Sequence, residues 1–305
     1  MIKNFKLLNN KTVFYFNDNK FETFPNIWLR DHIKNKENWD FKTNQRITYT
    51  ANLDINIKVK KAKLLKKGKF IEILWSDENK PTKYSYEFLK KNSLKKEETK
   101  SDTQFWKDKD IKNQIFINYK QLQTKVGFKN LLKKIHIYGF AVVRNCSKNL
   151  NSVEYIAKKI GYVRNSIFGG LWTFESNNKK ADSAYSNQEL RPHTDSTYSN
   201  DAPGLQLLLC CKYDAKGGDS IMVDGFKLAN EIKQKYKKHF KTLTNTKVKG
   251  SYIGDGVRLE AKRPIIKLNE KNNFDQISFN NYDRAPFRET NQKTINFYKA
   301  IKVFD

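Results

Sequence analysis

The chain has 305 residues, of which 38% are hydrophobic and 13% aromatic, so its composition excludes a wholly disordered protein. Lys and Arg outnumber Asp and Glu by 59 to 32, giving a net charge of +27, but only nine of the basic residues are Arg. Because the Lys residues are spread along the whole chain, we interpret the charge as a solvated coat. A nucleic-acid-binding protein, which would use Arg to contact bases, stays a distant alternative.

The sequence also bears on the protein's compartment, through its apolar segments, its first residues and its cysteines. No apolar run is long enough for a membrane-spanning helix, and the first residues lack the apolar core and cleavage site of a signal peptide. Three cysteines are too few for a disulfide framework, which favours a reducing compartment. We expect a cytoplasmic protein with neither a membrane nor a nucleic acid as partner.

Residues 1–92 predict a small β-rich domain. Segments rich in β-branched and aromatic residues, separated by polar breaks, predict short strands. They are KTVFYFN (11–17), RITYTANL (46–53), KFIEILW (69–75) and the alternation around Tyr84 and Tyr86. The polar, charged segment 93–110 predicts a linker to a second domain over 111–305.

The second domain opens with helical periodicity over 119–136, an apolar run at 137–146 that predicts a buried strand, and a helix over 152–160 with Ser152 as its N-cap. Strands and turns then dominate. The predicted strands are LQLLLCC (205–211), DSIMVDG (219–225), PIIKLN (264–269) and FDQISFNN (274–281), and the predicted helices are 226–240 and 291–305. This order predicts a mainly β fold, a sandwich or barrel with flanking helices.

The sharpest chemical motif is Arg191-Pro192-His193-Thr194-Asp195. On an extended segment, residues two apart point to the same face, so His193 and Asp195 are placed to ligate one metal ion. A second His from a distant strand would complete the two-His, one-carboxylate triad that leaves positions open on Fe(II). The tripeptide alone is a weak signal, because a His beside an Asp is more often a surface pair.

The context of this motif strengthens it. FGGLW (168–172) precedes it, and GGDS (217–220), VDGF (223–226) and FNNYDRAP (279–286) follow. With these motifs the chain, from about Thr23 to its last residue, resembles the Fe(II)/2-oxoglutarate dioxygenases of trimethyllysine and γ-butyrobetaine, in the taurine-dioxygenase-like superfamily. The resemblance implies a distorted double-stranded β-helix (jelly-roll) after the small N-terminal domain. It also implies Fe(II), 2-oxoglutarate and O2, ascorbate as reductant, a small quaternary-ammonium substrate and a possible homodimer.

The resemblance also assigns roles to particular residues. It places His193 and Asp195 on iron, Ser220 on the far carboxylate of 2-oxoglutarate, and Trp172 and Tyr185 in an aromatic cage. It also places Phe168, where the family usually has Tyr, together with Asp182 and Asn281 at the substrate. A cage is physically apt, because a trimethylammonium group donates no hydrogen bond and is held by the faces of aromatic rings. The alternatives are ordinary packing for the aromatic residues and a simple turn role for Ser220.

Asp182 helps to choose between two substrates. The resemblance implies Asp at this position in the trimethyllysine dioxygenases, as in this chain, and Asn in the γ-butyrobetaine enzymes. An acid suits the free amino group of trimethyllysine, whereas it would repel the lone carboxylate of γ-butyrobetaine. We therefore expect hydroxylation of trimethyllysine, with γ-butyrobetaine hydroxylation as the alternative. A solvated loop acid is the simpler interpretation of Asp182, because its surroundings are polar.

Two departures from the family pattern stand out. The positions that match its structural zinc ligands are Ile33, Asn35, Asn38 and Asn79, none of them a good zinc ligand, so we expect no structural zinc. The chain has only four His, and its last residues match the helix that precedes the distal iron ligand and the 2-oxoglutarate Arg. We therefore expect that the chain is truncated at its C-terminus, lacks the third iron ligand and is inactive alone. His239 is only a weak substitute for that ligand. A non-catalytic relic is a further alternative.

Overall fold

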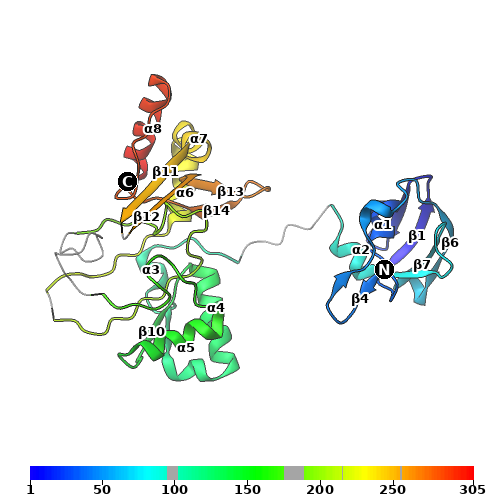
Figure 1. Ribbon diagram of the computed structural model, residues 1–305, viewed down its shortest axis with the longest axis horizontal. Helices are drawn as coiled ribbons and strands as arrows, with labels where there is room; N and C mark the ends of the chain where they lie inside the picture. Colours follow the sequence, from blue (N-terminus) through cyan, green and yellow to red (C-terminus); the bar gives the residue numbers. More distant parts are fainter. Residues whose placement is uncertain (95–101, 175–188, 215, 255) are drawn as a thin grey trace. The chain divides into compact units, whose positions relative to one another are not determined.

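The computed structural model describes residues 1–94, 102–174, 189–214, 216–254 and 256–305. Its contacts divide the chain into two compact units, Met1–Ser101 and Asp102–Asp305, which are described separately (Figure 1). Among the described residues, no helix combines the length and the apolar character that crossing a bilayer requires.

The N-terminal unit is built on two antiparallel sheets of three strands each. Their orders are β1-β2-β3 and β6-β7-β8, so every strand pairs with its neighbour in the chain. The strands are β1 (Ile2–Leu7), β2 (Lys11–Phe16), β3 (Phe21–Pro25), β6 (Val59–Leu65), β7 (Phe70–Trp75) and β8 (Thr82–Ser85). Along β7 alternate side chains are buried, which is the period of two expected for a strand with one face on a core.

Short elements connect these sheets. They are α1 (Asn26–Asp31), β4 (Trp39–Asp40), β5 (Gln45–Arg46), η1 (Thr50–Asn52), η2 (Lys66–Gly68) and α2 (Tyr86–Lys91). The predicted strand at 46–53 is wrong beyond its first residue, because Ile47 and Tyr49 are exposed and the chain turns into η1. Ser85 begins α2 as its N-cap, since its hydroxyl accepts a hydrogen bond from the Phe88 amide at 3.0 Å.

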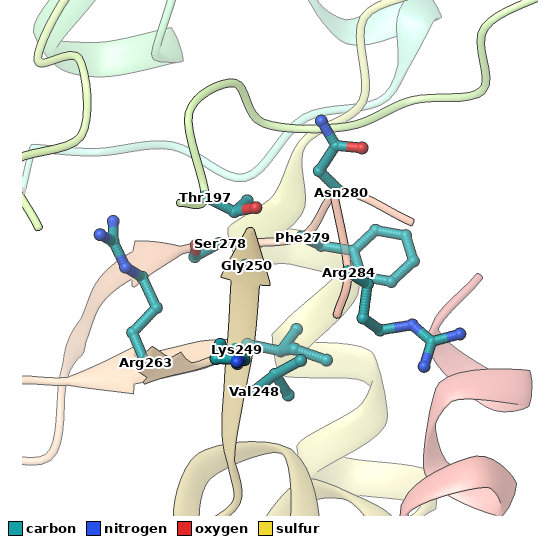
Figure 2. A pocket seen from close by; sticks show the side chains of 10 residues that line it. Thr197, Val248, Lys249, Gly250, Arg263, Ser278, Phe279, Asn280 and Arg284 are labelled. Carbon is teal, nitrogen blue, oxygen red and sulfur yellow. The ribbon is translucent and has the colours of Figure 1, made fainter. Parts of the chain in front are cut away.

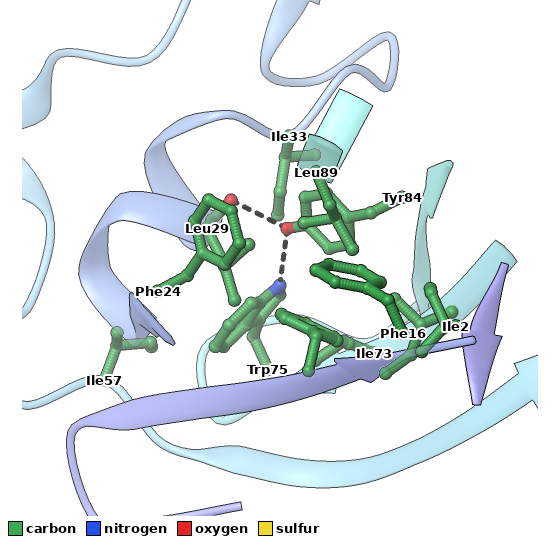
Figure 3. Close-up of a cluster of buried hydrophobic side chains, with 12 residues drawn as sticks. Ile2, Phe16, Phe24, Leu29, Ile33, Ile57, Ile73, Trp75, Tyr84 and Leu89 are labelled. Atoms are coloured by element: carbon green, nitrogen blue, oxygen red, sulfur yellow. Dashed lines mark hydrogen bonds between the residues drawn. The ribbon is translucent and has the colours of Figure 1, made fainter. Parts of the chain in front are cut away.

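A tight core lies between the sheets and α1 (Figure 3). Leu29, Ile73 and Trp75 are completely buried there. The indole Nε1 of Trp75 donates to the hydroxyl of Tyr84 at 3.2 Å, and that hydroxyl donates to the Leu29 carbonyl at 2.7 Å. Burial raises the pKa of the Tyr84 hydroxyl, so it stays protonated and keeps this donation. Every polar atom of this relay is thus paired without contact with water.

Polar residues occupy the region where the resemblance implied zinc ligands. The Arg30 guanidinium is buried and forms ion pairs with Asp77 at 2.9 Å and Glu78 at 2.6 Å. It also donates to the Asn38 side-chain oxygen at 3.0 Å, while Asn38 Nδ2 donates to Asn35 Oδ1 at 2.7 Å. Two of the four positions are therefore members of one hydrogen-bonded network; the other two hold a buried Ile33 and an exposed Asn79.

The C-terminal unit begins with a layer of helices beside a two-stranded parallel sheet, β9–β10. Its elements are α3 (Asp108–Ile111), β9 (Phe116–Asn118), η3 (Tyr119–Gln123), α4 (Lys125–Tyr138), β10 (Val142–Arg144) and α5 (Leu150–Ile160). The helix predicted at 119–136 is divided at Thr124, whose hydroxyl accepts from Gly127 and caps α4. The predicted buried strand is only three residues long, with Val142 exposed, and the N-cap of α5 is Asn149, which accepts from Ser152.

The rest of this unit packs three helices against two hairpins. The elements are α6 (Gly225–Lys235), α7 (Lys237–Asn245), β11 (Lys247–Gly254), β12 (Val257–Pro264), β13 (Ile266–Leu268), β14 (Phe274–Ile277) and α8 (Asn291–Phe304). The strands predicted at 264–269 and 274–281 and the helix at 291–305 are confirmed with shorter bounds. The helix at 226–240 is divided at Tyr236 into α6 and α7.

Two predicted strands, 205–211 and 219–225, are wrong. Residues 205–211 and 219–224 lack regular structure, α6 begins at Gly225, and Leu208 and Ile221 are 66% and 69% exposed. An apolar run becomes a strand only where a neighbour satisfies its backbone, and within the described ranges neither segment has a ladder partner. The described chain is therefore a mixture of helices and small sheets of two or three strands, and a mainly β character applies only to Met1–Ser101.

Candidate functional site

Residues 191–198, which carry the His-x-Asp motif, are irregular and are fixed by the end of β14. The Thr194 amide donates to the Phe279 carbonyl at 2.7 Å, and the Phe279 amide donates to the Thr194 hydroxyl at 2.9 Å. A weaker contact joins the Thr197 hydroxyl to Asp283 at 3.5 Å. The segment thus owes its position to a loop more than eighty residues away in sequence, and not to a strand of its own.

Strand β11 also approaches this segment, at Gly250, which lies beside Thr197 (Figure 2). A Cβ at this glycine would lie 2.6 Å from the carbonyl carbon and oxygen of Thr197, closer than real contacts allow. A side chain of any size here would therefore displace the motif. Beside this contact, Thr197 and Gly250 line a cavity of about 20 Å³, together with Phe279 and Arg284.

The motif brings His193 and Asp195 together. Nε2 of His193 lies 3.1 Å from Oδ1 of Asp195, and Nδ1 lies 2.7 Å from the Arg191 carbonyl oxygen. Because a carbonyl only accepts, Nδ1 carries the proton and Nε2 faces the carboxylate. Adjacent ligands of an octahedral ion with bonds of about 2.1 Å are separated by roughly 3 Å, so the pair already has the spacing that one divalent ion requires.

Their protonation follows from this contact. The hydrogen bond with Asp195 raises the pKa of His193 to about 9, against a smaller opposing effect of burial. The same hydrogen bond lowers the pKa of Asp195. Without a metal the two residues therefore form an ion pair, and a metal ion must replace the proton on Nε2.

A pocket of about 240 Å³ opens beside His193. Asn281, which the sequence analysis placed in the substrate pocket, lines it together with Phe279 and Tyr282. The Tyr282 ring meets the His193 imidazole edge-on with ring centres 6.0 Å apart, and its hydroxyl accepts from the Arg191 amide at 3.1 Å. The candidate metal ligand and Asn281 therefore share one cavity.

The aromatic residues form a series of rings. The rings of Phe168 and Trp172 lie 5.5 Å apart in a tilted arrangement. Phe168 also meets Tyr252 of β11 edge-on at 6.0 Å, and Tyr252 lies 5.0 Å from Tyr198, three residues after Asp195. Tyr252 and Tyr198 therefore connect the Phe168–Trp172 pair to the segment that carries the His-x-Asp motif, a role that the sequence analysis did not assign.

The two matches to protein families follow the two units. Residues 108–303 match the family described as "Taurine catabolism dioxygenase TauD, TfdA family". Residues 9–90 match "Gamma-butyrobetaine hydroxylase-like, N-terminal". The chain belongs to the TauD/TfdA dioxygenase family. The His-x-Asp pair and its pocket lie within the part that matches this family.

Individual relatives agree with this membership. The chain is 32% identical over 281 residues to the human mitochondrial trimethyllysine dioxygenase and 31% identical over 274 residues to the rat protein, in each case covering 86% of this chain. It spans 64% of the length of both relatives. It is 27% identical over 308 residues to human gamma-butyrobetaine dioxygenase, covering 94% of this chain and 76% of that protein.

The sequence analysis also named Ser220, Asp182 and Tyr185 and, as a weak substitute ligand, His239. Ser220 is exposed in the irregular segment before α6, Asp182 and Tyr185 fall outside the described residues, and His239 lies on α7 beside Tyr236. Within the described ranges, no group of three or more His, Cys, Asp or Glu is placed to hold a metal. The pair His193–Asp195 thus stands as two candidate ligands of a family site.

The sequence analysis also missed Gln206, which contacts Asp195 directly. Its Nε2 donates to Asp195 Oδ2 at 2.7 Å. The residue lies in LQLLLCC, the apolar run that was interpreted only as a strand. A single polar side chain inside an otherwise apolar run was the signal available for finding it.

Proposed function

We propose that the protein is an Fe(II)- and 2-oxoglutarate-dependent oxygenase that hydroxylates a small trimethylammonium substrate. The observation that carries this proposal is the contact of His193 with Asp195 at 3.1 Å beside a pocket that Asn281 also lines. Membership of the TauD/TfdA family supports the reaction class. We further propose the double-stranded β-helix as the architecture of 111–305, joined by a linker at 93–110 to the small domain 1–92.

The residues present suit the metal. His193 Nε2 and Asp195 Oδ1 would hold Fe(II), and the Arg191 carbonyl fixes the imidazole in the tautomer that exposes Nε2. When bound, the metal supplies activation of O2 for attack on a C–H bond, coupled to the conversion of 2-oxoglutarate to succinate and CO2. Ser220 would contact the far carboxylate of 2-oxoglutarate, and ascorbate would keep the iron reduced.

The substrate side of the proposal rests on aromatic and amide groups. Trp172 is partly exposed, and its ring, backed by Phe168, offers a face to a trimethylammonium group. Tyr185 would add a further ring to this cage. Asn281 would hydrogen-bond the polar end of the substrate from the wall of the pocket. Binding at two ends fixes which carbon faces the metal.

We propose trimethyllysine as the substrate, with γ-butyrobetaine as the second candidate. Support comes from the identity to the human and rat trimethyllysine dioxygenases, 32% and 31%, against 27% to human gamma-butyrobetaine dioxygenase, whereas the trimethyllysine dioxygenase of Meyerozyma guilliermondii is also 27% identical. It also comes from Asp182, whose carboxylate would attract the free amino group of trimethyllysine and repel a lone carboxylate.

The test is succinate formation dependent on each substrate, with Fe(II), 2-oxoglutarate and ascorbate, using the full product of the gene. We expect turnover with trimethyllysine, its loss in His193→Ala, and a shift of kcat/KM towards γ-butyrobetaine in Asp182→Asn. Absence of turnover with both substrates would refute the proposed function. Equal preference in the wild-type protein and Asp182→Asn would refute the role of Asp182 alone. The expectation that the 305-residue chain is inactive by itself is tested in the same assay.

A further inference from the structure

Gln206 contacts one of the two candidate ligands on the side away from the other. Oδ1 of Asp195 faces Nε2 of His193 at 3.1 Å, and Oδ2 accepts a hydrogen bond from Gln206 Nε2 at 2.7 Å. The two oxygens of one carboxylate therefore have separate partners. The χ2 angle of an Asp side chain is otherwise broadly distributed, so this bond restricts the orientation of the carboxylate plane and leaves one oxygen facing the imidazole.

We propose that Gln206 is a positioning residue that holds Asp195 for metal binding through a single oxygen. This inference rests on the function proposed above. In this proposal each ligand has an outer partner, which is a group hydrogen-bonded to the atom that does not bind the metal. The outer partner of His193 Nδ1 is the Arg191 carbonyl, and that of Asp195 Oδ2 is the Gln206 amide. Such partners orient ligands, and their removal commonly lowers metal affinity about 10- to 100-fold.

The neutrality of the amide is part of this role. The chain carries 59 Lys and Arg residues, yet the side chain on Oδ2 is an uncharged Gln. A cation at this position would also donate a hydrogen bond, but it would reduce the negative potential that attracts a divalent ion. Gln206 thus fixes the carboxylate while leaving its charge available to the metal.

The partner of His193 is a backbone carbonyl, which no substitution removes, so Gln206 is the outer partner that mutation can test. Gln206→Met keeps the approximate size and removes the donor. Gln206→Lys keeps a donor and adds a charge. Gln234→Met makes the same change at an exposed position of α6 and serves as the control. Because Gln206 is itself exposed, all three variants are expected to fold, which circular dichroism checks.

The experiment is titration of the 305-residue chain with Co(II), followed by the visible d–d absorption of the bound ion, with His193→Ala as the baseline. We expect Gln206→Met to weaken Co(II) binding about 10-fold and to change the d–d spectrum, Gln206→Lys to weaken it further, and Gln234→Met to match the wild type. Wild-type affinity and spectrum in Gln206→Met would overturn the inference while leaving the proposed function intact. A wild-type chain that binds no more Co(II) than His193→Ala would also overturn the inference, and the succinate assay described above decides the proposed function separately.

Discussion

Charged side chains are arranged differently in the two units. In the N-terminal unit, Arg30 is buried and paired with Asp77 and Glu78. In the C-terminal unit, Asp195 is 39% exposed on an irregular segment that is fixed from outside by β11 and the loop after β14. The first arrangement fixes a small fold, whereas the second leaves the polar groups accessible to a ligand, as segments that carry function usually do.

This difference indicates that the N-terminal unit is stabilised by its own buried core and ion pairs. The candidate site is held in place by contacts from β11 and from the loop after β14. Truncating a buried side chain of the N-terminal unit should lower the free energy of unfolding of that unit. Changing a residue that holds the motif segment of the C-terminal unit in place should mainly alter metal binding. The following changes separate these two consequences.

Trp75→Ala is expected to have the largest effect. The residue is fully buried in the N-terminal core and its indole donates to Tyr84, so truncation leaves a cavity and removes one of the two hydrogen bonds of the Tyr84 hydroxyl. We expect a loss of about 3–5 kcal/mol in the unfolding of this unit, measured by urea denaturation followed by circular dichroism. Trp172→Ala, at a partly exposed position of the other unit, should lose less than about 1 kcal/mol. Equal losses would contradict the contrast between the units.

Arg30→Met tests the buried ion pairs. Removing the guanidinium deprives the Glu78 carboxylate of its cation, but Asn38 still donates to Glu78 and Asp77 is partly open to water, so we expect about 3 kcal/mol rather than the upper value for such pairs. Arg46→Met removes a more exposed pair with Asp31 and should cost under about 1 kcal/mol. An Arg30→Met unit as stable as the wild type would show that the network is not needed for stability.

Gly250→Val disturbs a support of the site. Its side chain would overlap the Thr197 carbonyl, so the strain should cost about 1–3 kcal/mol and displace His193 and Asp195. Co(II) affinity, measured as above, should fall while the N-terminal unit unfolds as in the wild type. Gly204→Ala, where a Cβ meets nothing within 4 Å, is the control. Unchanged affinity in Gly250→Val would mean that β11 does not position the motif.

Tyr84→Phe removes the central hydroxyl of the Trp75–Leu29 relay and should cost about 1–2 kcal/mol at neutral pH. It also has a pH signature. Burial raises the pKa of Tyr84 in the folded state, so its contribution is complete below the unfolded pKa of about 10 and is lost as pH rises above it. The stability difference between the wild type and Tyr84→Phe should therefore shrink above about pH 10. A difference that stays constant would exclude this linkage.

Metal chelation should have the smallest effect on the N-terminal unit. Asn35 and Asn38 are hydrogen-bonded to each other and to neighbours, and Ile33 is buried, so we expect EDTA to leave the unfolding midpoint unchanged. Zinc analysis of the purified chain provides a second measurement. A marked loss of stability on chelation would reveal a structural metal that these side chains do not explain.

The sequence predicted the elements whose pairing is local. Strands β2 and β7 pair with neighbours a few residues away, and both are rich in the β-branched and aromatic residues that indicate strands. The runs 205–211 and 219–225 also have the composition of strands, but composition does not specify a partner, and the prediction failed there. Helix breaks at Thr124 and Tyr236 were missed, because apolar periodicity continues through both.

The candidate site shows the same limit. His193 and Asp195 were predicted because their spacing in sequence is itself the signal, and Asn281 because its motif resembles the family. Tyr252 was not, because its contact with Phe168 joins residues far away in sequence, and Gln206 was not, because only the folded chain shows that it meets Asp195. Gly250 likewise matters only because Thr197 lies against it.

The central claim is that His193 and Asp195 form the metal-binding pair beside a pocket shared with Asn281. The most direct test is the broadening of backbone amide NMR signals of the 305-residue chain by substoichiometric Mn(II). Our account predicts that broadening centres on residues 191–196, with Gln206 and 279–282 next, and disappears in His193→Ala. Broadening centred instead on His239 or His32, or unchanged in His193→Ala, would contradict it.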